Sequence, residues 1–159
     1  MASFDELSTR NRLLLAAYPW RRAEPAWAPP RGPLSELRVA IVTSAGFYRP
    51  GLDLPFRPIL GGDASWRALP TDVDLSVLRL GQVSHSFDRR ALKADPASGF
   101  PVPHLAALAA AGIIGAVAPR HISVNGSILA AGRLVKHTGP AVADLLAQDR
   151  VDLALFVPV

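Results

Sequence analysis

The segment that most constrains the fold is the apolar stretch at residues 151–157, which is followed by Pro158 and Val159. A run of this length without polar alternation is typical of a strand buried on both faces, as in a parallel sheet. In open α/β sheets the chemistry lies in loops just beyond the carboxyl ends of such strands. We therefore expect an α/β fold that is incomplete at its C-terminus, because the sequence stops where such a loop would begin.

The remaining pattern supports a mainly parallel open sheet flanked by helices, since the later elements alternate between helix and strand. We predict strands at 38–43, 75–83, 113–117 and 151–157, and helices at 4–20, 101–112 and 140–150. Residues 44–46 are predicted to form a turn, and residues 47–71 a long loop that is ordered by its aromatic side chains. A proline-rich connector ends near residue 33. We therefore expect an N-terminal helix and connector over 1–33 and one α/β domain over 34–159.

Composition excludes several classes of protein. Lys and Arg exceed Asp and Glu by 17 to 13, but the basic residues are scattered, so we expect no nucleic-acid partner. The balance favours small anionic molecules or acidic partners. The absence of cysteine excludes disulfides, thiolate metal sites and a thiol nucleophile within these residues. The chain has neither a secretory signal nor an apolar run of about 20 residues, and we expect a cytoplasmic protein without membrane contact.

A glycine-rich segment at 61–67 offers the first candidate binding groups, namely Gly62, Asp63, Ser65 and Arg67. Glycine lets backbone N–H groups approach an anion, and arginine presents a bidentate fork to a carboxylate or phosphate. The alternative, which the pattern alone favours, is a turn tied together by an ion pair between Asp63 and Arg67. No nucleotide-binding motif occurs here, and we predict no cofactor.

His85 and Asp88 follow the predicted strand at 75–83 and are candidate catalytic groups. Histidine titrates near neutral pH, and a nearby carboxylate can orient its ring and stabilise its cation. The alternative is a surface histidine with a local salt bridge. His104 and His137 are interpreted as surface residues.

A second polar segment at 119–126 follows the predicted strand at 113–117. It supplies His121 as a catalytic candidate, with Ser123, Asn125 and Gly126 as candidates for substrate binding. Loops that follow successive strands raise the odds of a shared cleft. A serine hydrolase is not supported, because the G-x-S-x-G turn is missing. A metal site is not predicted, because no tight histidine spacing occurs.

Taken in order, the segments VTSAGFY, GDASWRALP, VSHSFDRRALKADP, GFPVPHLAALAAAGIIGAVAPRHISVNG and VDLALFVPV resemble the selenoprotein B family of glycine, sarcosine, betaine and D-proline reductases. The resemblance covers roughly residues 38–159. It implies reductive cleavage of the carbon–nitrogen bond of an amino acid or its N-methylated derivative. It also implies that a selenocysteine or cysteine attacks and that a disulfide-type couple restores it. By resemblance, the site is surrounded by Gly62, Asp63, Ser65, Arg67, His85, Asp88, His121, Ser123 and Gly126.

The sequence departs from that family in one respect. Relatives carry the redox residue in a loop immediately after the strand that resembles 151–159, and this sequence contains no such residue. We expect the reading frame to continue beyond Val159 and to encode selenocysteine or cysteine. A UGA codon read as stop, a deliberate truncation and a split gene remain open as explanations. The isolated residues are expected to be inactive as a reductase and to depend on partner subunits or on a missing C-terminal portion.

Two other functions stay open from the residues alone. One is a non-catalytic binding or regulatory module, in which the glycine-rich segment and Arg67 hold a small carboxylate and nothing is reduced. The other is a thiol-independent lyase or racemase that uses His85 and His121 as acid and base.

Overall fold

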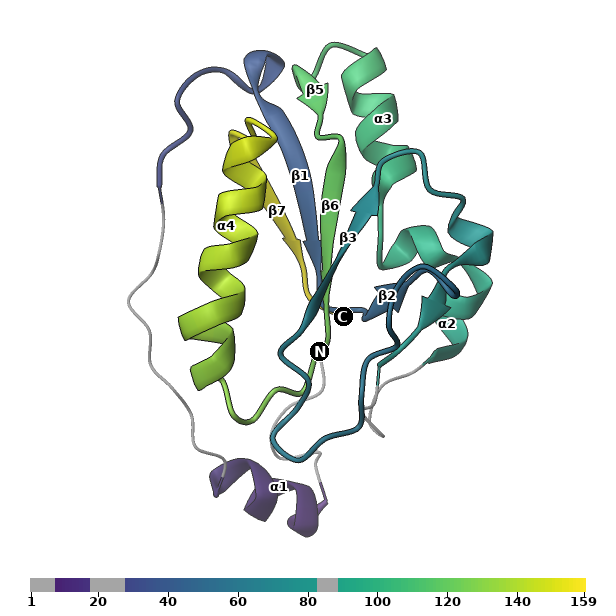
Figure 1. Ribbon diagram of the computed structural model, residues 1–159, viewed down its shortest axis with the longest axis vertical. Coiled ribbons are helices and arrows are strands. Elements are labelled where there is room, and N and C mark those ends of the chain that lie inside the picture. Colours follow the sequence, from purple (N-terminus) through teal and green to yellow (C-terminus); the bar gives the residue numbers. More distant parts are fainter. Residues whose placement is uncertain (1–7, 18–27, 83–88) are drawn as a thin grey trace.

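A computed structural model of the 159-residue chain describes residues 8–17, 28–82 and 89–159 (Figure 1). The strands are β1 (Arg38–Thr43), β2 (Phe47–Tyr48), β3 (Trp66–Pro70), β4 (Arg79–Leu80), β5 (Ala116–Val117), β6 (Arg120–Val124) and β7 (Leu153–Val157). The α-helices are α1 (Thr9–Ala16), α2 (Arg89–Ala94), α3 (Val102–Ala110) and α4 (Gly139–Gln148). Single 3-10 turns lie at η2 (Leu34–Glu36), η3 (Leu75–Val77) and η4 (Pro96–Ser98), and a π-helical turn, η5 (Leu134–Thr138), precedes α4.

Strand β1 lies at the centre of the main sheet. It pairs in parallel with β7 along its length, from Val39 opposite Leu153 to Thr43 opposite Val157. On its other side it pairs in parallel with β5 and then with β6. Strand β3 is antiparallel to β6 and forms the far edge. The predicted α/β class with a mainly parallel sheet is therefore confirmed.

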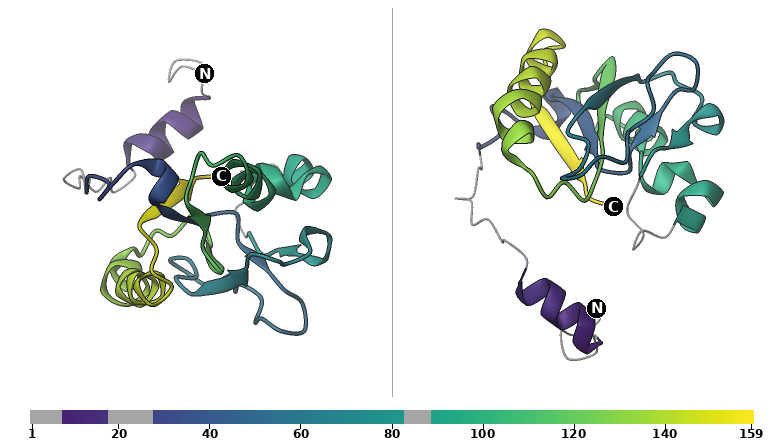
Figure 2. Two further views of the ribbon diagram at one scale, coloured as in Figure 1. Left: turned by 90° about the horizontal axis from the view of Figure 1, so that it is seen from above. Right: turned by 60° about the horizontal axis from the view of Figure 1, so that its bottom comes forward.

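Helix α3 packs on one face of this sheet beside β5, and Figure 2 shows α4 on the opposite face. Alternate residues of β1 point to opposite faces, as the two-residue period of a strand requires. Val39 and Ile41 belong to the main buried cluster on the α3 face. The other members of that cluster are Ala45, Phe47, Leu69, Leu78, Leu92, Phe100, Val102, Leu105 and Ile114. This face carries the hydrophobic core of the molecule.

The helix α4 begins where a proline forces a change in the hydrogen-bond pattern. Proline has no N–H and crowds the preceding turn, so Pro140 cannot continue the ladder of an upstream α-helix. The turn before it is π-helical, a geometry that occurs mostly as single turns. Helix α3 carries prolines in its first turn, and it is followed by Gly112 with a φ of +69°, a common way to end a helix.

Several strands differ from the sequence prediction. The predicted strand at 75–83 is wrong: residues 75–77 form a 3-10 turn, and only β4 remains, paired with β2 in a separate two-stranded ribbon. The 3-10 turn at 75–77 is fixed at its start by Asp74, whose carboxylate accepts the Ser76 N–H at 2.8 Å. Local capping of this kind competes with strand formation.

The segment predicted as a loop at 119–126 is largely strand β6, and the predicted strand at 113–117 is reduced to the two residues of β5. Pro119 separates β5 from β6, because proline cannot donate to the ladder. Strand β3, inside the predicted long loop at 47–71, was also missed. It lies at an edge, where Pro70 is tolerated.

Among the residues that the structure describes, no helix is long and apolar enough to cross a bilayer. Helix α1 falls within the predicted N-terminal helix at 4–20.

Candidate functional site

The carboxyl ends of the parallel strands bring buried polar side chains together. Thr43 ends β1 and lies opposite Ser123 of β6. The Thr43 hydroxyl donates to the Gly99 carbonyl at 2.6 Å and accepts the Ala45 N–H at 3.2 Å. Asn125 follows β6 directly, bridges to Ala45 and is only 2% exposed. We call Thr43, Ser44, Gln82, Ser123, Asn125 and Gly126 the carboxyl-edge cluster.

Three polar atoms of this cluster lack partners. Within residues 8–17, 28–82 and 89–159, no group forms a hydrogen bond with the Ser123 hydroxyl or with either side-chain amide atom of Asn125. A buried polar group without a partner costs about 1–3 kcal/mol, so native proteins rarely leave one unsatisfied. The cluster therefore has capacity for a water molecule, a ligand or another segment of chain. It can donate from Ser123 and Asn125 and accept at both.

Glycines let three backbone segments meet at this edge. The Gly81 N–H donates to the Gly46 carbonyl at 2.8 Å. A Cβ on Gly126 would lie 2.7 Å from the Gln82 amide nitrogen, which donates to the Ser44 carbonyl at 3.3 Å. Gln82 is therefore fixed beside Gly126 at the end of β6.

The candidates His85 and Asp88 lie outside the described residues. Gln82 and Arg89, the nearest described residues on either side of them, lie together. Gln82 belongs to the carboxyl-edge cluster, and the Arg89 guanidinium donates to its carbonyl. The predicted convergence of His85 with Arg67 and His121 stays a prediction.

The antiparallel pairing of β3 with β6 brings the glycine-rich segment to the same edge. Trp66 begins β3 and lies opposite Val124, so the residues before Trp66 lie beside the residues after Val124. Gly62 has a φ of +91°, and a Cβ there would lie 2.7 Å from the Ile128 Cα. The Ala130 N–H donates to the Gly61 carbonyl at 2.9 Å. The tertiary fold thus gathers candidates that are about 60 positions apart in the sequence.

Asp63 holds the glycine-rich segment in shape. Its carboxylate accepts the Arg57 N–H at 2.8 Å and the Ser65 N–H at 3.0 Å. Burial acts to raise the pKa of Asp63, but these hydrogen bonds outweigh it and the pKa lies below its usual value. The predicted ion pair between Asp63 and Arg67 is absent from the described structure, and backbone amides take its place.

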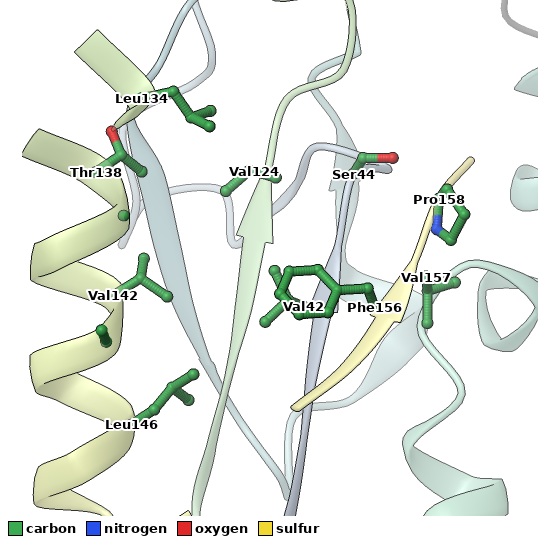
Figure 3. Close-up of a pocket in the computed structure, with 12 residues that line it drawn as sticks. Val42, Ser44, Val124, Leu134, Thr138, Val142, Leu146, Phe156, Val157 and Pro158 are labelled. Carbon is green, nitrogen blue, oxygen red and sulfur yellow. The ribbon is translucent and has the colours of Figure 1, made fainter. Parts of the chain in front are cut away.

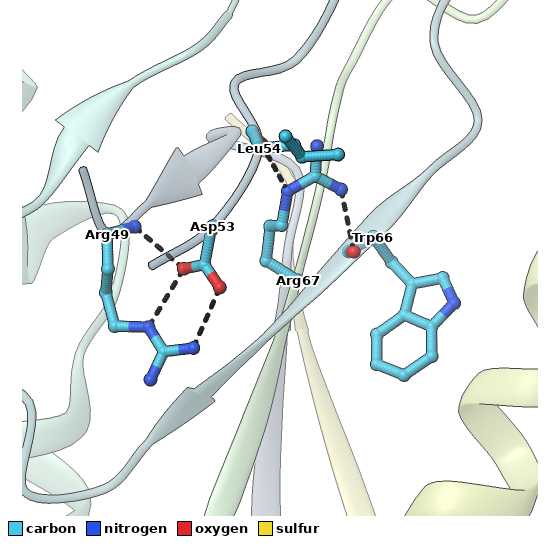
Figure 4. Close-up of polar contacts among 5 residues, drawn as sticks. All are labelled: Arg49, Asp53, Leu54, Trp66 and Arg67. Atoms are coloured by element: carbon cyan, nitrogen blue, oxygen red, sulfur yellow. Dashed lines mark hydrogen bonds and ion pairs between the residues drawn. The ribbon is translucent and has the colours of Figure 1, made fainter. Parts of the chain in front are cut away.

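Arg67 is engaged by backbone carbonyls (Figure 4). Its Nε donates to the Leu54 carbonyl at 2.7 Å, and one terminal nitrogen donates to the Trp66 carbonyl at 2.8 Å and to the Ser65 hydroxyl at 3.0 Å. Its guanidinium carbon lies 4.3 Å from the centre of the Phe56 ring, a cation–π arrangement. Arg67 therefore secures the loop before β3, and its fork is occupied by protein groups.

A neighbouring ion pair supports the same loop. Arg49 and Asp53 form a bidentate pair, with N–O distances of 2.9 and 2.8 Å, and the Arg49 N–H also donates to Asp53. Burial acts to raise the pKa of Asp53, while its hydrogen bonds to Arg49 lower it, and the net shift is downward. These groups stabilise the loop and were not singled out from the sequence.

His121 lies inside the molecule on the α3 face of β6, where it is fully buried. Its Nδ1 accepts the Ile41 N–H at 3.0 Å, and its Nε2 lies 3.1 Å from the Thr71 hydroxyl. The Phe100 ring meets it edge to face at 5.5 Å. Burial lowers the pKa of His121 to about 4, so the ring is neutral at pH 7. This geometry fits a structural histidine that ties β6 to β1 and to Thr71 better than an acid or base that touches substrate.

Ser44 was missed by the sequence interpretation. Its N–H donates to the Val157 carbonyl at 3.1 Å, and its hydroxyl accepts the Val159 N–H at 2.9 Å. It thereby joins the carboxyl ends of β1 and β7. Its position directly after a strand of the sheet was the available signal.

An apolar cavity of about 480 Å³ lies between α4 and the sheet (Figure 3). Val142 and Leu146 of α4 face Val42 of β1 and Phe156 of β7 across it. Ser44 and Thr138 line its end at the carboxyl edge. Within the described residues, no three His, Asp or Glu side chains are grouped to hold a metal ion.

Comparison with known proteins finds a relative among the reductases. The chain is 33% identical over 133 residues to D-proline reductase subunit gamma from Acetoanaerobium sticklandii. The matched part is 83% of this chain and 52% of that subunit, so the chain spans about half the length of this relative. No protein-family model and no solved structure matches the chain. The similarity supports a relationship with amino-acid reductases at the family level.

Proposed function

We propose that this chain is a component of an amino-acid reductase of the selenoprotein B type. The single observation that carries the proposal is the 33% identity over 133 residues to D-proline reductase subunit gamma. The order of motifs between residues 38 and 159 is consistent with it. The substrate class is an amino acid or an N-methylated derivative, and partner reductase subunits complete the activity.

The chemistry needs a group that these residues do not contain. Reductive cleavage of a carbon–nitrogen bond takes up two electrons and two protons, and it leaves one C–H and one N–H bond. A selenol or thiolate suits this step, because it is nucleophilic at neutral pH and is reversibly oxidised to a disulfide-type bond. The chain has no cysteine. In this proposal the redox group comes from polypeptide outside the 159 residues.

The role of the chain is then to form one wall of the site. Ser123 and Asn125 carry the unpartnered buried polar atoms, and they are proposed to hold the substrate together with Gly126. Asp63 and Arg67 are engaged by their own loop, so they are proposed to shape the wall and not to contact the substrate. His85 and Asp88 keep their proposed place beside the reacting centre.

The two rival functions differ in what supports them. A small-carboxylate-binding module that uses the glycine-rich segment and Arg67 is weakened, because Arg67 donates to groups of its own loop. A module that binds through the carboxyl-edge cluster instead stays the second candidate. A racemase or lyase that uses His121 as acid or base has less support. Both ring nitrogens of His121 are engaged, and burial holds its pKa well below the working range of such a catalyst.

Binding and chemistry should be tested separately on the 159-residue chain. Two-dimensional amide NMR with D-proline, glycine, sarcosine and betaine should show shifts centred on the carboxyl-edge cluster for at least one of them. The Ser123→Ala variant should weaken that binding several-fold, and Ser35→Ala on an exposed turn should leave it unchanged. No amine should be released with dithiothreitol as reductant.

Three results would count against the proposal. Amine release by the chain alone would show that no outside redox group is needed. Deuterium uptake at Cα in heavy water would favour the racemase. Equal binding of unrelated carboxylates such as acetate, with no preference for amino acids, would favour the binding module.

A further inference from the structure

A second cavity lies between the β2–β4 ribbon and α2, on the side of the molecule away from α4 (Figure 1). Its volume is about 670 Å³, within the usual range of small-molecule sites. Its floor is apolar and includes the buried side chains of Phe47, Leu78 and Leu92. Its lining contains no residue of the carboxyl-edge cluster, so the proposed reductase function does not use it.

Cationic side chains surround this floor. Arg79 comes from β4, and Arg89 and Lys93 come from successive turns of α2. Tyr48 and Ser76 add hydroxyl groups, and none of the described residues that line the cavity is acidic. Three positive charges around an apolar floor create a local potential that attracts an anion.

Two described carboxylates near the cavity, Asp74 and Asp95, form hydrogen bonds with their own turns. Asp74 accepts the Ser76 N–H at 2.8 Å, and Asp95 accepts the Ala97 N–H at 3.0 Å, so each caps its own 3-10 turn. In the described part of the chain, no carboxylate forms an ion pair with Arg79, Arg89 or Lys93. Within the described residues, Arg79 forms one long hydrogen bond of 3.4 Å, to the Leu78 carbonyl. One terminal nitrogen of Arg89 donates to the Gln82 carbonyl. Arg79, Lys93 and the other nitrogens of Arg89 therefore keep N–H donors for a ligand.

We propose that this cavity binds a small organic anion, with its carboxylate or phosphate group at Arg79, Arg89 and Lys93 and its apolar body on the Phe47, Leu78 and Leu92 floor. Guanidinium groups match the oxygen geometry of both anions, and charge-assisted hydrogen bonds are stronger than neutral ones. The apolar floor adds affinity for the body of the ligand and distinguishes it from a free inorganic ion.

The probes are phenyl phosphate, benzoate, inorganic phosphate and neutral benzyl alcohol, followed by amide NMR and calorimetry on the 159-residue chain. Phenyl phosphate or benzoate should bind, with shifts at β2, β4 and α2, and their ratio tells which anionic group is preferred. Inorganic phosphate and benzyl alcohol should each bind about tenfold more weakly or not at all. Inorganic phosphate lacks the apolar body, and benzyl alcohol lacks the anionic group.

The test variant is Arg79→Gln with Lys93→Gln, and the matched control is Arg133→Gln with Lys136→Gln. All four side chains are exposed, so both variants should fold, and both remove two positive charges. Binding should fall about tenfold or more in the test variant and stay unchanged in the control. Equal loss in the two variants would overturn the proposal in favour of nonspecific charge attraction. The absence of binding by both organic anions would also overturn it.

Discussion

The two faces of the central sheet are packed very differently. On the α3 face, Phe100 is fully buried and its ring contacts both Phe47 and His121. On the α4 face, Phe156 is 70% exposed, and α4 contributes no buried side chain of its own. One face is a closed core, and the other encloses an apolar cavity of about 480 Å³.

This difference shows that apolar composition alone does not fix burial. Strand β7 is entirely apolar, yet it lies at a sheet edge with a loosely covered face. Strand β1 has a similar composition and lies at the centre with both faces covered. An exposed apolar edge is a surface to which another polypeptide can add.

The largest expected effect comes from truncating a phenylalanine on each face. Phe100→Ala should reduce the free energy of unfolding by about 3–5 kcal/mol, because it leaves a cavity in a closed core. Phe156→Ala should cost less than about 1 kcal/mol, because most of the ring is already in water. Urea denaturation measures both. Similar losses for the two variants would show that the faces are packed alike in solution.

The next largest effect is a pH dependence that belongs to the closed face. His121 has a folded-state pKa of about 4, below its usual unfolded value near 6.5, so the unfolded chain binds the proton more tightly. Its contribution to stability is complete above pH 6.5 and is lost as the pH falls toward 4. The total is up to about 3 kcal/mol.

Denaturation at several pH values measures this effect. His121→Asn should flatten the slope between pH 6.5 and 4, whereas the exposed His104 and His137 should have no such influence when replaced by asparagine. An unchanged slope in His121→Asn would place the titration elsewhere.

A smaller contrast comes from adding one methylene to each face. Val39→Leu in the closed core should cost about 1–3 kcal/mol through overpacking. Val142→Leu should be neutral or stabilise by up to about 0.8 kcal/mol, because the cavity beneath α4 has room for the added group. Val135→Leu, at an exposed position of η5, is the control for the same substitution where there is no cavity to fill. A loss in Val142→Leu comparable to that in Val39→Leu would mean that the cavity is filled.

The smallest effect on folding, and the most specific to the open face, concerns self-association. We expect the chain to self-associate through β7, because its edge and Phe156 are apolar and uncovered. Phe156→Lys should lower the apparent mass in light scattering at high concentration while changing folding stability by less than about 0.5 kcal/mol. Leu52→Lys, at a loop position that is 78% exposed, is the control. A wild-type chain that stays monomeric at high concentration would contradict this expectation.

Sequence reasoning found the elements whose signal is local. Strands β1 and β7 were predicted within a few residues because each is a short continuous apolar run. Helices α3 and α4 were predicted equally well, because their sequences favour a helix and begin near a proline. The predicted strand at 75–83 failed because Asp74 caps a turn, and His121 was placed in a loop because Pro119 resembles a strand ending. In both cases a local turn signal competed with a weak strand pattern.

The sequence by itself determined the α/β class, the absence of thiol chemistry within the chain, and the polar segments at 61–67 and 119–126. Only the tertiary structure decided which of those side chains keep polar atoms that can bind a ligand. The antiparallel pairing of β3 with β6 brought the two segments to one edge. Hydrogen bonds then engaged Asp63, Arg67 and His121 within the fold and left polar atoms of Ser123 and Asn125 without partners. The physical reason is that a buried polar group takes its partners from segments distant in sequence, which no local pattern encodes.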